Sequence, residues 1–408
     1  MLPTARRSTC GRRLARRLGV AGAALAVAAA QLLAAPVAGS RGPGPATPQT
    51  AAPNAITLGE NQLPFTTRYE HDMHGSITRI SNSLMTCDET KVPPLDPNQA
   101  ACVDARKGDG PLPINNNFFM KYINIDPNGV GPSGDPIYSA SSADLHLLDG
   151  SEVKYARLYW GGTRGIGTKV LPESKIDEVY LKLPGNTQYT NIANDQPSIG
   201  YITTTDESSY QASADVTDLV KAHGNGTYTV GNMNSVVQPH SWGGWTIVVA
   251  YENPCLPYRN IHLWDGFQVE LPDTPSRTIE LTDLKTPGTA DTDVRGKLGY
   301  VVYDGDLKWT GDTVAVRTNT SPMTHFTDIN HQADDAFNST IEELDPIDRF
   351  KRNPYNRNNF GYDSDTWDIS NLLHVGDDTI TVTFDTVKDG YNLGVFFTHI
   401  DLSCQPRA

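Results

Sequence analysis

The sequence predicts an all-β protein made of two tandem jelly-roll-like β-sandwiches. Many short segments rich in β-branched and aromatic residues are separated by turn formers, which is typical of sandwich strands. Among 408 residues there are 35 glycines and 28 prolines, and only 20% of the residues are charged. A third observation is an internal repeat, described below. No heptad or collagen-like period is present, so fibrous classes are excluded.

The chain begins with the pattern of an export signal. Six arginines precede an apolar run from Leu18 to Ala35, and small residues follow it up to Ser40. A basic region, an apolar core and a small-residue exit define a signal peptide. A membrane anchor is the alternative, but the run is Ala-rich and only weakly apolar. We predict that residues 1–39 are cleaved near Gly39; Sec and twin-arginine export both remain open.

Cleavage would leave a strongly acidic protein. Removing six arginines from the 33 basic residues leaves 27, against 47 acidic residues. A surface of this charge disfavours nucleic acids and anionic lipids, and we expect no stable membrane insertion after cleavage. Residues 40–60 are rich in Pro, Gly and Ala, which predicts a linker. The mature protein is therefore expected outside the cell, released or associated with the cell wall.

Four cysteines remain after residue 39: Cys87, Cys102, Cys255 and Cys404. An even number in an exported chain indicates disulfides, and three pairings are possible. We favour Cys87–Cys102, which closes a local loop, and Cys255–Cys404, which would join the first strand of a domain to its last. A zinc site is disfavoured because no CxxC spacing occurs.

The strongest strand signals divide at a turn. Trp245–Tyr251 reads as a strand buried on both faces, and Asn253-Pro254 then breaks it. We therefore predict a first sandwich over residues 61–253 and a second over residues 254–408. The other expected strands are Ile77–Ile80, Phe119–Ile123, Val153–Trp160, Ile261–Trp264, Phe267–Leu271, Thr278–Leu281, Leu298–Tyr303, Thr379–Phe384 and Leu393–Ile400.

The internal repeat supports two similar units. Residues 215–230 (DVTDLV, then GNGTYTV) match residues 368–382 (DISNLL, then GDDTITV). Each copy is an acidic turn residue, two aliphatics, a glycine turn and an alternating strand, and each is followed by another apolar strand. We expect Asp215 and Asp368 to be turn-forming side chains. Jelly-roll modules often carry such a turn before their penultimate strand.

A family resemblance covers about residues 70–402. Its segments are ISNSLMTC at 80–87, LYWG at 158–161, residues 215–230, GWTIVVAY at 244–251, RNI at 259–261, DGF at 265–267, YDGD at 303–306, TGD at 310–312 and FNSTI at 337–341. Together they resemble the amino-terminal region of large bacterial secreted or cell-surface proteins, which often precedes tandem immunoglobulin-like repeats and a wall anchor. The resemblance implies a cell-surface protein and assigns no catalytic residues. This sequence ends directly after the last expected strand, which favours release from the cell.

Acidic loops are candidate calcium ligands, because calcium takes six to eight oxygen ligands. One group is Asp304, Asp306 and Asp312 at a strand end, and the other is Asp363, Asp365 and Asp368 before the repeated turn. Turn capping and solvation are the alternative roles of these side chains. Calcium is the only cofactor that the sequence suggests.

Aromatic side chains are candidates for ligand binding. Trp242, Trp309 and Trp367 lie in loop or strand-edge contexts, whereas Trp160, Trp245 and Trp264 fit core positions. Exposed aromatic rings flanked by Asp and Asn suit sugar faces. The proposed ligand-binding residues are Trp242, Trp309, Tyr355 and Tyr362.

No catalytic motif stands out. A serine–histidine pair at 240–241 lacks a nucleophile elbow, and the many acids do not reveal a carboxylate pair. We therefore predict an adhesin-like or structural protein that binds a glycan or a cell-surface protein and is not an enzyme. The alternative is a secreted polysaccharide lyase or hydrolase on a jelly-roll scaffold. A self-assembling coat component is a third reading.

Overall fold

The computed structural model describes residues 62–91, 101–195, 199–204, 207–272, 274–288, 293–328, 330–342 and 351–403. The predicted signal peptide and linker lie outside these ranges. All described residues belong to one compact unit, Ile56–Ala408. Within the described ranges, the helices are all too short or too polar to span a membrane.

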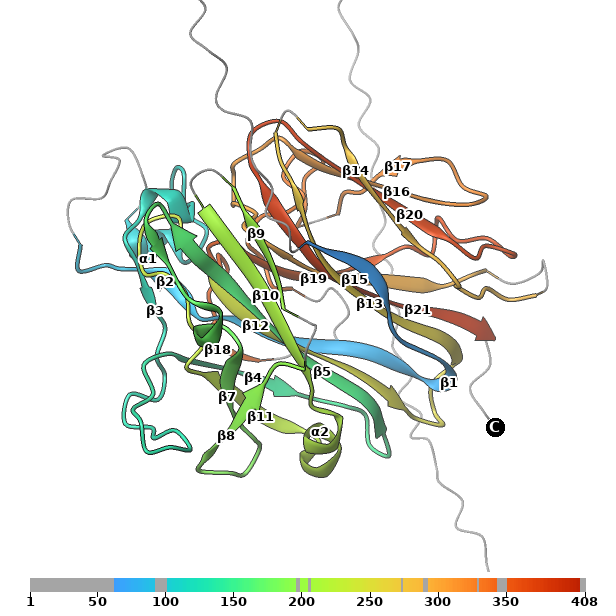
Figure 1. Cartoon of the computed structure of the whole chain (residues 1–408). Coiled ribbons are helices and arrows are strands. Elements are labelled where there is room, and N and C mark those ends of the chain that lie inside the picture. The colour runs from blue at the N-terminus through green and yellow to red at the C-terminus, as the bar shows by residue number, and fades with distance from the viewer. Residues whose placement is uncertain are drawn as a thin grey trace, which may run out of the picture. The chain divides into compact units, whose positions relative to one another are not determined.

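Strands dominate the chain from Leu63 onward (Figure 1). In chain order the elements are β1 (Leu63–Ser83), β2 (Met85–Cys87), α1 (Cys102–Ala105), a 3-10 turn (Asn115–Asn117), β3 (Met120–Tyr122), β4 (Ala140–Leu145), β5 (Glu152–Ile166), β6 (Lys169–Val170), a second 3-10 turn (Glu173–Lys175), β7 (Glu178–Lys182), β8 (Tyr189–Ala193), β9 (Gly200–Thr203), β10 (Glu207–Asp215), α2 (Thr217–His223), β11 (Gly226–Gly231), β12 (Gly243–Glu252), β13 (Tyr258–Glu270), β14 (Arg277–Leu281), β15 (Gly296–Tyr303), β16 (Asp312–Thr318), β17 (Thr324–His325), β18 (Arg352–Asn353), β19 (Tyr362–Asp368), β20 (Ile380–Thr386) and β21 (Tyr391–Ser403).

The strand order is that of two jelly rolls. In the first, β1-β12-β5-β10 lie side by side in one sheet, and β4-β11-β7-β8 form the opposing sheet. In the second, the corresponding orders are β13-β21-β15-β19 and β14-β20-β16-β17. When the eight strands of each half are lettered B to I in chain order, both halves give B-I-D-G facing C-H-E-F, which is the jelly-roll order. The predicted fold class is confirmed.

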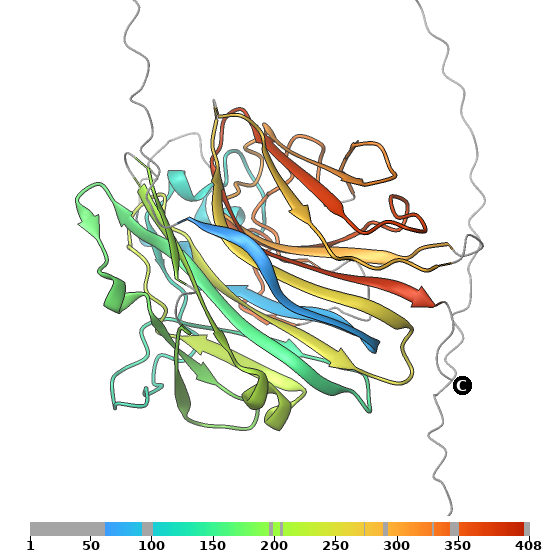
Figure 2. The same cartoon turned by 45° about the vertical axis from the view of Figure 1, so that its right-hand side comes forward.

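The two jelly rolls share one ten-stranded sheet, because β1 pairs with both of them. Its first part pairs with β13, up to His74 opposite Tyr258, and its second part pairs with β12, from Gly75 opposite Glu252 onward. In Figure 2 this blue strand runs between the strands of the first and second rolls. The predicted boundary at Asn253 falls in the turn between β12 and β13. Because one sheet continues from the first roll through β1 into the second, the division into two independent domains stays a prediction.

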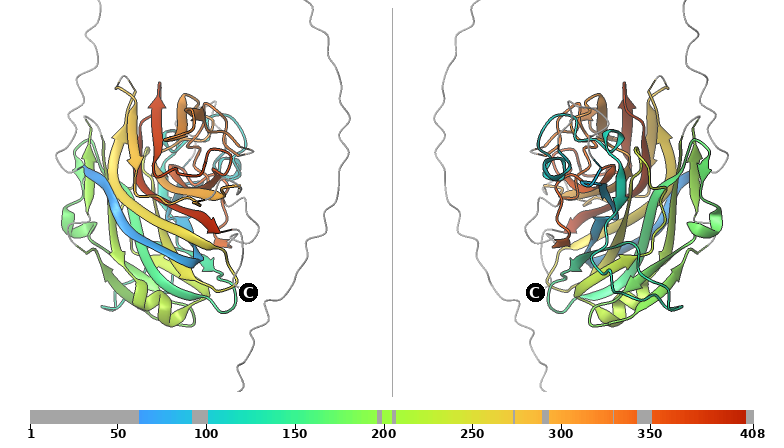
Figure 3. Two further views of the ribbon diagram at one scale, coloured as in Figure 1. Left: turned by 90° about the vertical axis from the view of Figure 1, so that its right-hand side faces the viewer. Right: turned by 90° about the vertical axis from the view of Figure 1, so that its left-hand side faces the viewer.

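Three hydrophobic cores follow from this arrangement. The first lies between the two sheets of the first roll and the second between those of the second roll. In each roll, the shared sheet has one face toward the roll interior and one face away from it. The two faces that point away from the interiors pack against each other and form the central core, which includes Val248 from β12, Val301 from β15 and Val395 from β21. Strand β12 is buried on both faces, as predicted. Figure 3 shows the green strands of the first roll and the orange-to-red strands of the second at opposite ends of the sheet.

Buried polar contacts also cross the joint. Asp265 of β13 accepts a bidentate pair of bonds from Arg68 of β1, at 2.8 and 2.9 Å, and a bond from the Tyr159 hydroxyl of β5 at 2.9 Å. Gln211 of β10 donates to the Gly266 carbonyl at 2.8 Å and accepts a bond from the Tyr303 hydroxyl. A buried carboxylate is stable only when such donors satisfy it, so these bonds fix how the rolls meet.

The sequence repeat corresponds to the same segment of each roll. Residues 215–230 run from the end of β10 into β11, and residues 368–382 run from the end of β19 into β20. Asp215 accepts the Thr217 backbone N–H at 2.8 Å, and Asp368 accepts that of Ser370 at 2.9 Å. Both aspartates therefore form the expected turns.

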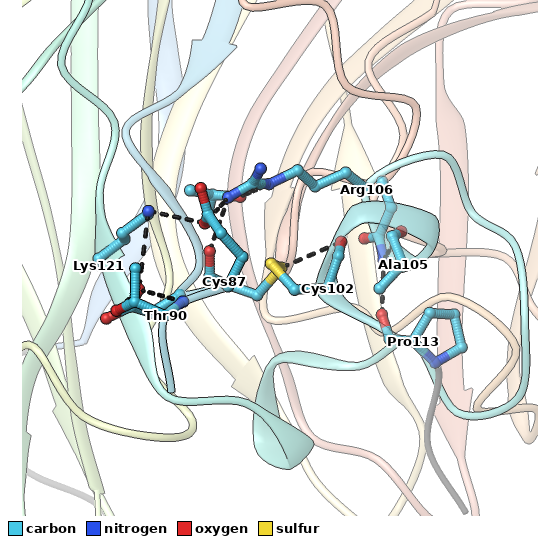
Figure 4. Close-up of a disulfide and its surroundings, with 11 residues drawn as sticks. Cys87, Thr90, Cys102, Ala105, Arg106, Pro113 and Lys121 are labelled. Atoms are coloured by element: carbon cyan, nitrogen blue, oxygen red, sulfur yellow. Dashed lines mark hydrogen bonds and ion pairs between the residues drawn. A yellow bond between two sulfur atoms is a disulfide. The ribbon is translucent and has the colours of Figure 1, made fainter. Parts of the chain in front are cut away.

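The predicted Cys87–Cys102 disulfide is present, with Cα atoms 5.7 Å apart (Figure 4). Arg106 donates from its guanidinium to the Cys87 carbonyl at 2.9 Å, which holds the short helix α1 against β2. Asn358, from the second roll, donates to the Ala105 carbonyl at 3.1 Å. Cys404 lies outside the described residues, so its pairing with Cys255 stays a prediction.

Replacing Gly75 with alanine is expected to destabilise the protein by about 1–3 kcal/mol or more. A Cβ at this position would lie 2.2 Å from the Tyr251 carbonyl oxygen, at the point where β1 changes partners. The measurement is urea unfolding followed by circular dichroism. The control is Gly288→Ala, because no atom lies within 4 Å of a Cβ added there. Equal stability of the two variants would contradict the described path of β1.

Candidate functional site

The jelly-roll topology gathers four connections at one end of each roll. In the B-I-D-G sheet all neighbouring strands are antiparallel, so strands B and D end where strands G and I begin. The B–C, D–E, F–G and H–I connections therefore leave from the same end. Side chains from these connections of both rolls meet around one pocket, which is our candidate functional site.

The pocket has a volume of about 190 Å³. Its acidic side chains are Glu207 from the start of β10, Asp304 after β15 and Asp389 before β21. The remaining lining residues are Asn116, Ile202, Thr204, Ser209, His240, Val269, Leu271, Gly390 and Asn392. Residues 202–240 belong to the first roll and residues 269–392 to the second, so the pocket lies at the joint.

Asn115 organises the acidic side of the pocket. Its side-chain amide donates to the His240 carbonyl at 3.1 Å and to Asp304 Oδ1 at 3.2 Å. Both of these partners have positive φ, 70° at His240 and 69° at Asp304. Residues other than glycine adopt this conformation mainly where the surroundings impose it, often at functional sites. The Glu207 carboxylate lies 3.0 Å from His240 Nδ1.

Asp304 and Asp389, two of the carboxyl groups that line the pocket, have raised pKa values. Burial raises the pKa of Asp304 well above its ordinary value, and the neighbouring Glu207 and Asp306 charges raise it further. Burial likewise raises the pKa of Asp389. The hydrogen bond that the Glu207 carboxylate accepts from His240 raises the pKa of His240. A cluster of perturbed groups in a pocket is typical of functional sites.

A second layer of acids lies behind the pocket. Burial raises the pKa of Asp306 to about 7 and that of Asp312 to about 6. Asp312 accepts the Phe337 backbone N–H at 2.7 Å, whereas Asp306 Oδ1 is buried without a hydrogen-bond partner among the described residues. The predicted group Asp304, Asp306 and Asp312 is therefore near one pocket, but only Asp304 lines it.

The other predicted calcium group is spread along β19. Asp363 is buried and accepts the Thr340 backbone N–H at 3.1 Å. Asp365 is buried and accepts bonds from the Tyr300 and Thr340 hydroxyls at 3.3 and 3.2 Å. Asp368 is exposed and forms the turn described above. Within the described ranges, no three His, Cys, Asp or Glu side chains converge to hold a metal ion, and calcium binding stays a prediction.

The structure buries most of the aromatic residues considered above and leaves two of them accessible to solvent. Trp160, Trp245 and Trp264 are in the cores, as predicted. Trp242, Trp367 and Tyr362 are buried as well, although Trp242 lies in the loop before β12 and Trp367 on β19 at the edge of the sheet, the contexts predicted for them. Trp242 stacks on Tyr303 with ring centres 5.0 Å apart, because the central core extends beneath its loop. Of the proposed ligand-binding residues, Trp309 is half-buried and Tyr355 is 68% exposed.

Sequence reasoning missed Glu207, Asp389 and Asn115. Glu207 is the first residue of β10 and Asp389 shortly precedes β21, and both strands begin at the pocket end of their roll. That position is their only sequence signal, and many other acids share it. Their proximity depends on the packing of two rolls, which no local pattern encodes.

No family model matches the chain, and no curated protein matches it. Among solved structures, the major capsid protein P2 from bacteriophage PM2 is similar, with 12% identity over 64% of this chain and 97% of that chain, at a TM-score of 0.19. The STIV MCP has 9% identity over 63% of this chain and 91% of that chain, at a TM-score of 0.18. Scores this low support no conclusion, so the fold assignment rests on the strand order.

Raising the pH from 4.5 to 7.5 is expected to lower the free energy of unfolding. Asp306 has a folded pKa of about 7, above its ordinary value near 4, so the folded state binds more protons between these pH values. Stability therefore falls as pH rises through this window. His240, whose pKa is also raised, acts in the same direction.

Asp306→Asn removes this titration. The change in the free energy of unfolding between pH 4.5 and pH 7.5 is expected to become smaller by on the order of a few kcal/mol, since one pKa unit is about 1.4 kcal/mol. Urea unfolding at pH 4.5, 6.0 and 7.5 measures it. Glu280→Gln, an exposed residue on β14, is the control and should leave the slope unchanged. Equal slopes for all three proteins would contradict the assignment.

Proposed function

We propose that the protein is an exported, non-catalytic β-sandwich protein that binds a glycan or a protein at a cell surface. The observation that carries this proposal is the pocket at the joint, where both rolls contribute side chains to one lining. Binding pockets commonly combine an apolar wall with a few fixed polar groups at such junctions. The export signal and acidic charge of the sequence support an extracellular setting.

Side chains outside the pocket are further candidates for contact. The Tyr355 ring is exposed and lies 4.7 Å from the Arg352 guanidinium carbon. Lys308, next to Trp309, donates to the Gly108 carbonyl at 2.8 Å and so ties its loop to the disulfide-linked segment of the first roll. Fixed loops favour binding because less conformational entropy is lost on association.

A second candidate function is hydrolysis of a polysaccharide. The observation that favours it is the set of carboxyl groups with raised pKa in the pocket, since a glycosidase needs one carboxyl that stays protonated. A pocket of about 190 Å³ holds about one sugar unit and not a chain, so binding remains the first proposal.

The test is co-sedimentation of the oxidised protein, starting at Ser40, with purified bacterial cell walls and extracellular polysaccharides. We expect sedimentation without release of reducing or unsaturated ends. Replacing both Trp309 and Tyr355 with alanine is expected to weaken sedimentation at least fivefold, whereas Val170→Ala, an exposed apolar control on β6, should not.

If product is released, and if Asp304→Asn and Asp389→Asn each abolish its release, the enzymatic alternative would be established instead. Absence of both sedimentation and product would contradict glycan binding. In that case size-exclusion chromatography would show whether self-association, as in a coat component, replaces it.

A further inference from the structure

The two walls of the joint pocket differ in chemistry. One wall is aliphatic and is formed by Ile202, Val269 and Leu271. The other carries the carboxyl groups of Glu207, Asp304 and Asp389 together with His240 and two asparagines. A ligand that fits both walls needs an apolar stem and a polar head.

The polar wall carries three carboxyl groups, and burial raises the pKa of two of them, Asp304 and Asp389. A cation bound beside them would favour their ionised form, so its binding would be coupled to the release of protons. Among the described lining residues the one basic side chain is His240, whose Nδ1 lies 3.0 Å from the Glu207 carboxylate.

Behind the wall, Asp306 is 2% exposed, and its Oδ1 has no hydrogen-bond partner among the described residues. Asn115, which is fully buried and bonded to Asp304, likewise has an unpartnered Oδ1. These two acceptors lie behind the pocket and do not line it. On the wall itself three carboxyl groups stand beside one histidine, so a ligand head that donates hydrogen bonds and carries positive charge complements this wall.

A bare metal ion fits this pocket poorly. Within the described part of the chain, no three acidic or histidine side chains converge on one point, and one wall is aliphatic. The pocket suits a side chain of a partner protein better than a sugar ring, because none of the described residues that line it is a Trp, Tyr or Phe; Trp242 is stacked on Tyr303 in the core. Contact with a glycan would fall instead to Trp309 and Tyr355, which lie outside the pocket. An ammonium group on an aliphatic stem satisfies both walls, since three N–H donors meet the acceptors and the stem covers the apolar side.

We propose that the joint pocket binds an alkylammonium group, carried either by a lysine side chain of a partner protein or by a small free amine. This inference deepens the proposed function, because it assigns a ligand class to the same pocket. It also agrees with the acidic charge of the protein, which attracts cationic partners.

Binding is tested directly on the purified protein by calorimetry at pH 7.5 and constant ionic strength. The probes are n-butylammonium chloride and, as a neutral analogue of the same shape, n-butanol. We expect butylammonium to bind at least tenfold more tightly than butanol. Equal affinity for the two probes would overturn the proposal, because the carboxyl wall would then contribute nothing.

Variants locate the site. Glu207→Gln and Asp389→Asn are each expected to weaken butylammonium binding at least fivefold, whereas the exposed control Glu280→Gln should leave it unchanged. Circular dichroism checks that each variant is folded. Binding that neither pocket variant affects would overturn the assignment to this pocket. Calcium binding in place of butylammonium would also overturn it and would favour a metal site.

Two further probes separate the sources of the ammonium group. If Nα-acetyl-lysine-amide binds and acetylation of its ε-amino group abolishes the binding, the source is a lysine of a partner protein. Binding of 1,4-diaminobutane without binding of the lysine amide supports a free amine. These measurements use no cell surface. Amine binding without wall sedimentation would therefore contradict the proposed glycan function alone, and sedimentation without amine binding would contradict this inference alone.

Discussion

The whole arrangement depends on one strand that hydrogen-bonds to two jelly rolls. Strand β1 pairs with β13 along its first part and with β12 along its second part, so the first strand of the first roll also lies beside the first strand of the second roll. Backbone groups left unpaired at this point would be buried, and the shared strand satisfies them. The change of partner occurs at Gly75, where only a residue without a side chain fits against the Tyr251 carbonyl. The same geometry turns the outer faces of both rolls toward each other and encloses the central core.

The candidate site is a consequence of that joint. Neither roll contains the pocket alone, since Glu207 and His240 come from one and Asp304 and Asp389 from the other. The carboxylate of Asp265, held by donors from β1 and β5, lies within the joint and keeps the rolls in register. Ionisation of the pocket acids opposes this packing, because burial raises the pKa of Asp304 and Asp389, and a cation in the pocket would favour their ionised form. The acidic wall is therefore explained more readily by binding than by stability.

Much of the fold could be predicted from the sequence, because its signals are local. The repeated turns at Asp215 and Asp368 each depend on one carboxylate and a backbone N–H two residues later. The apolar strand from Trp245 to Tyr251 indicated burial on both faces, and the Cys87–Cys102 disulfide closes a short loop. The site could be predicted only in part. Asp304 was identified, but the other pocket acids, Glu207 and Asp389, lie far from it in the sequence on either side. Trp242 is buried by a core that exists only when the rolls pack.

Native-state hydrogen exchange tests most directly whether the two jelly rolls form one cooperative unit around β1. The amides of β12 in the first roll and of β21 in the second are buried and far apart in sequence. If β1 and the central core join the rolls, the most protected amides of both strands should exchange with the same free energy and the same denaturant dependence. Two distinct free energies, with one roll opening while the other stays protected, would contradict the account and would separate the pocket walls into independent domains.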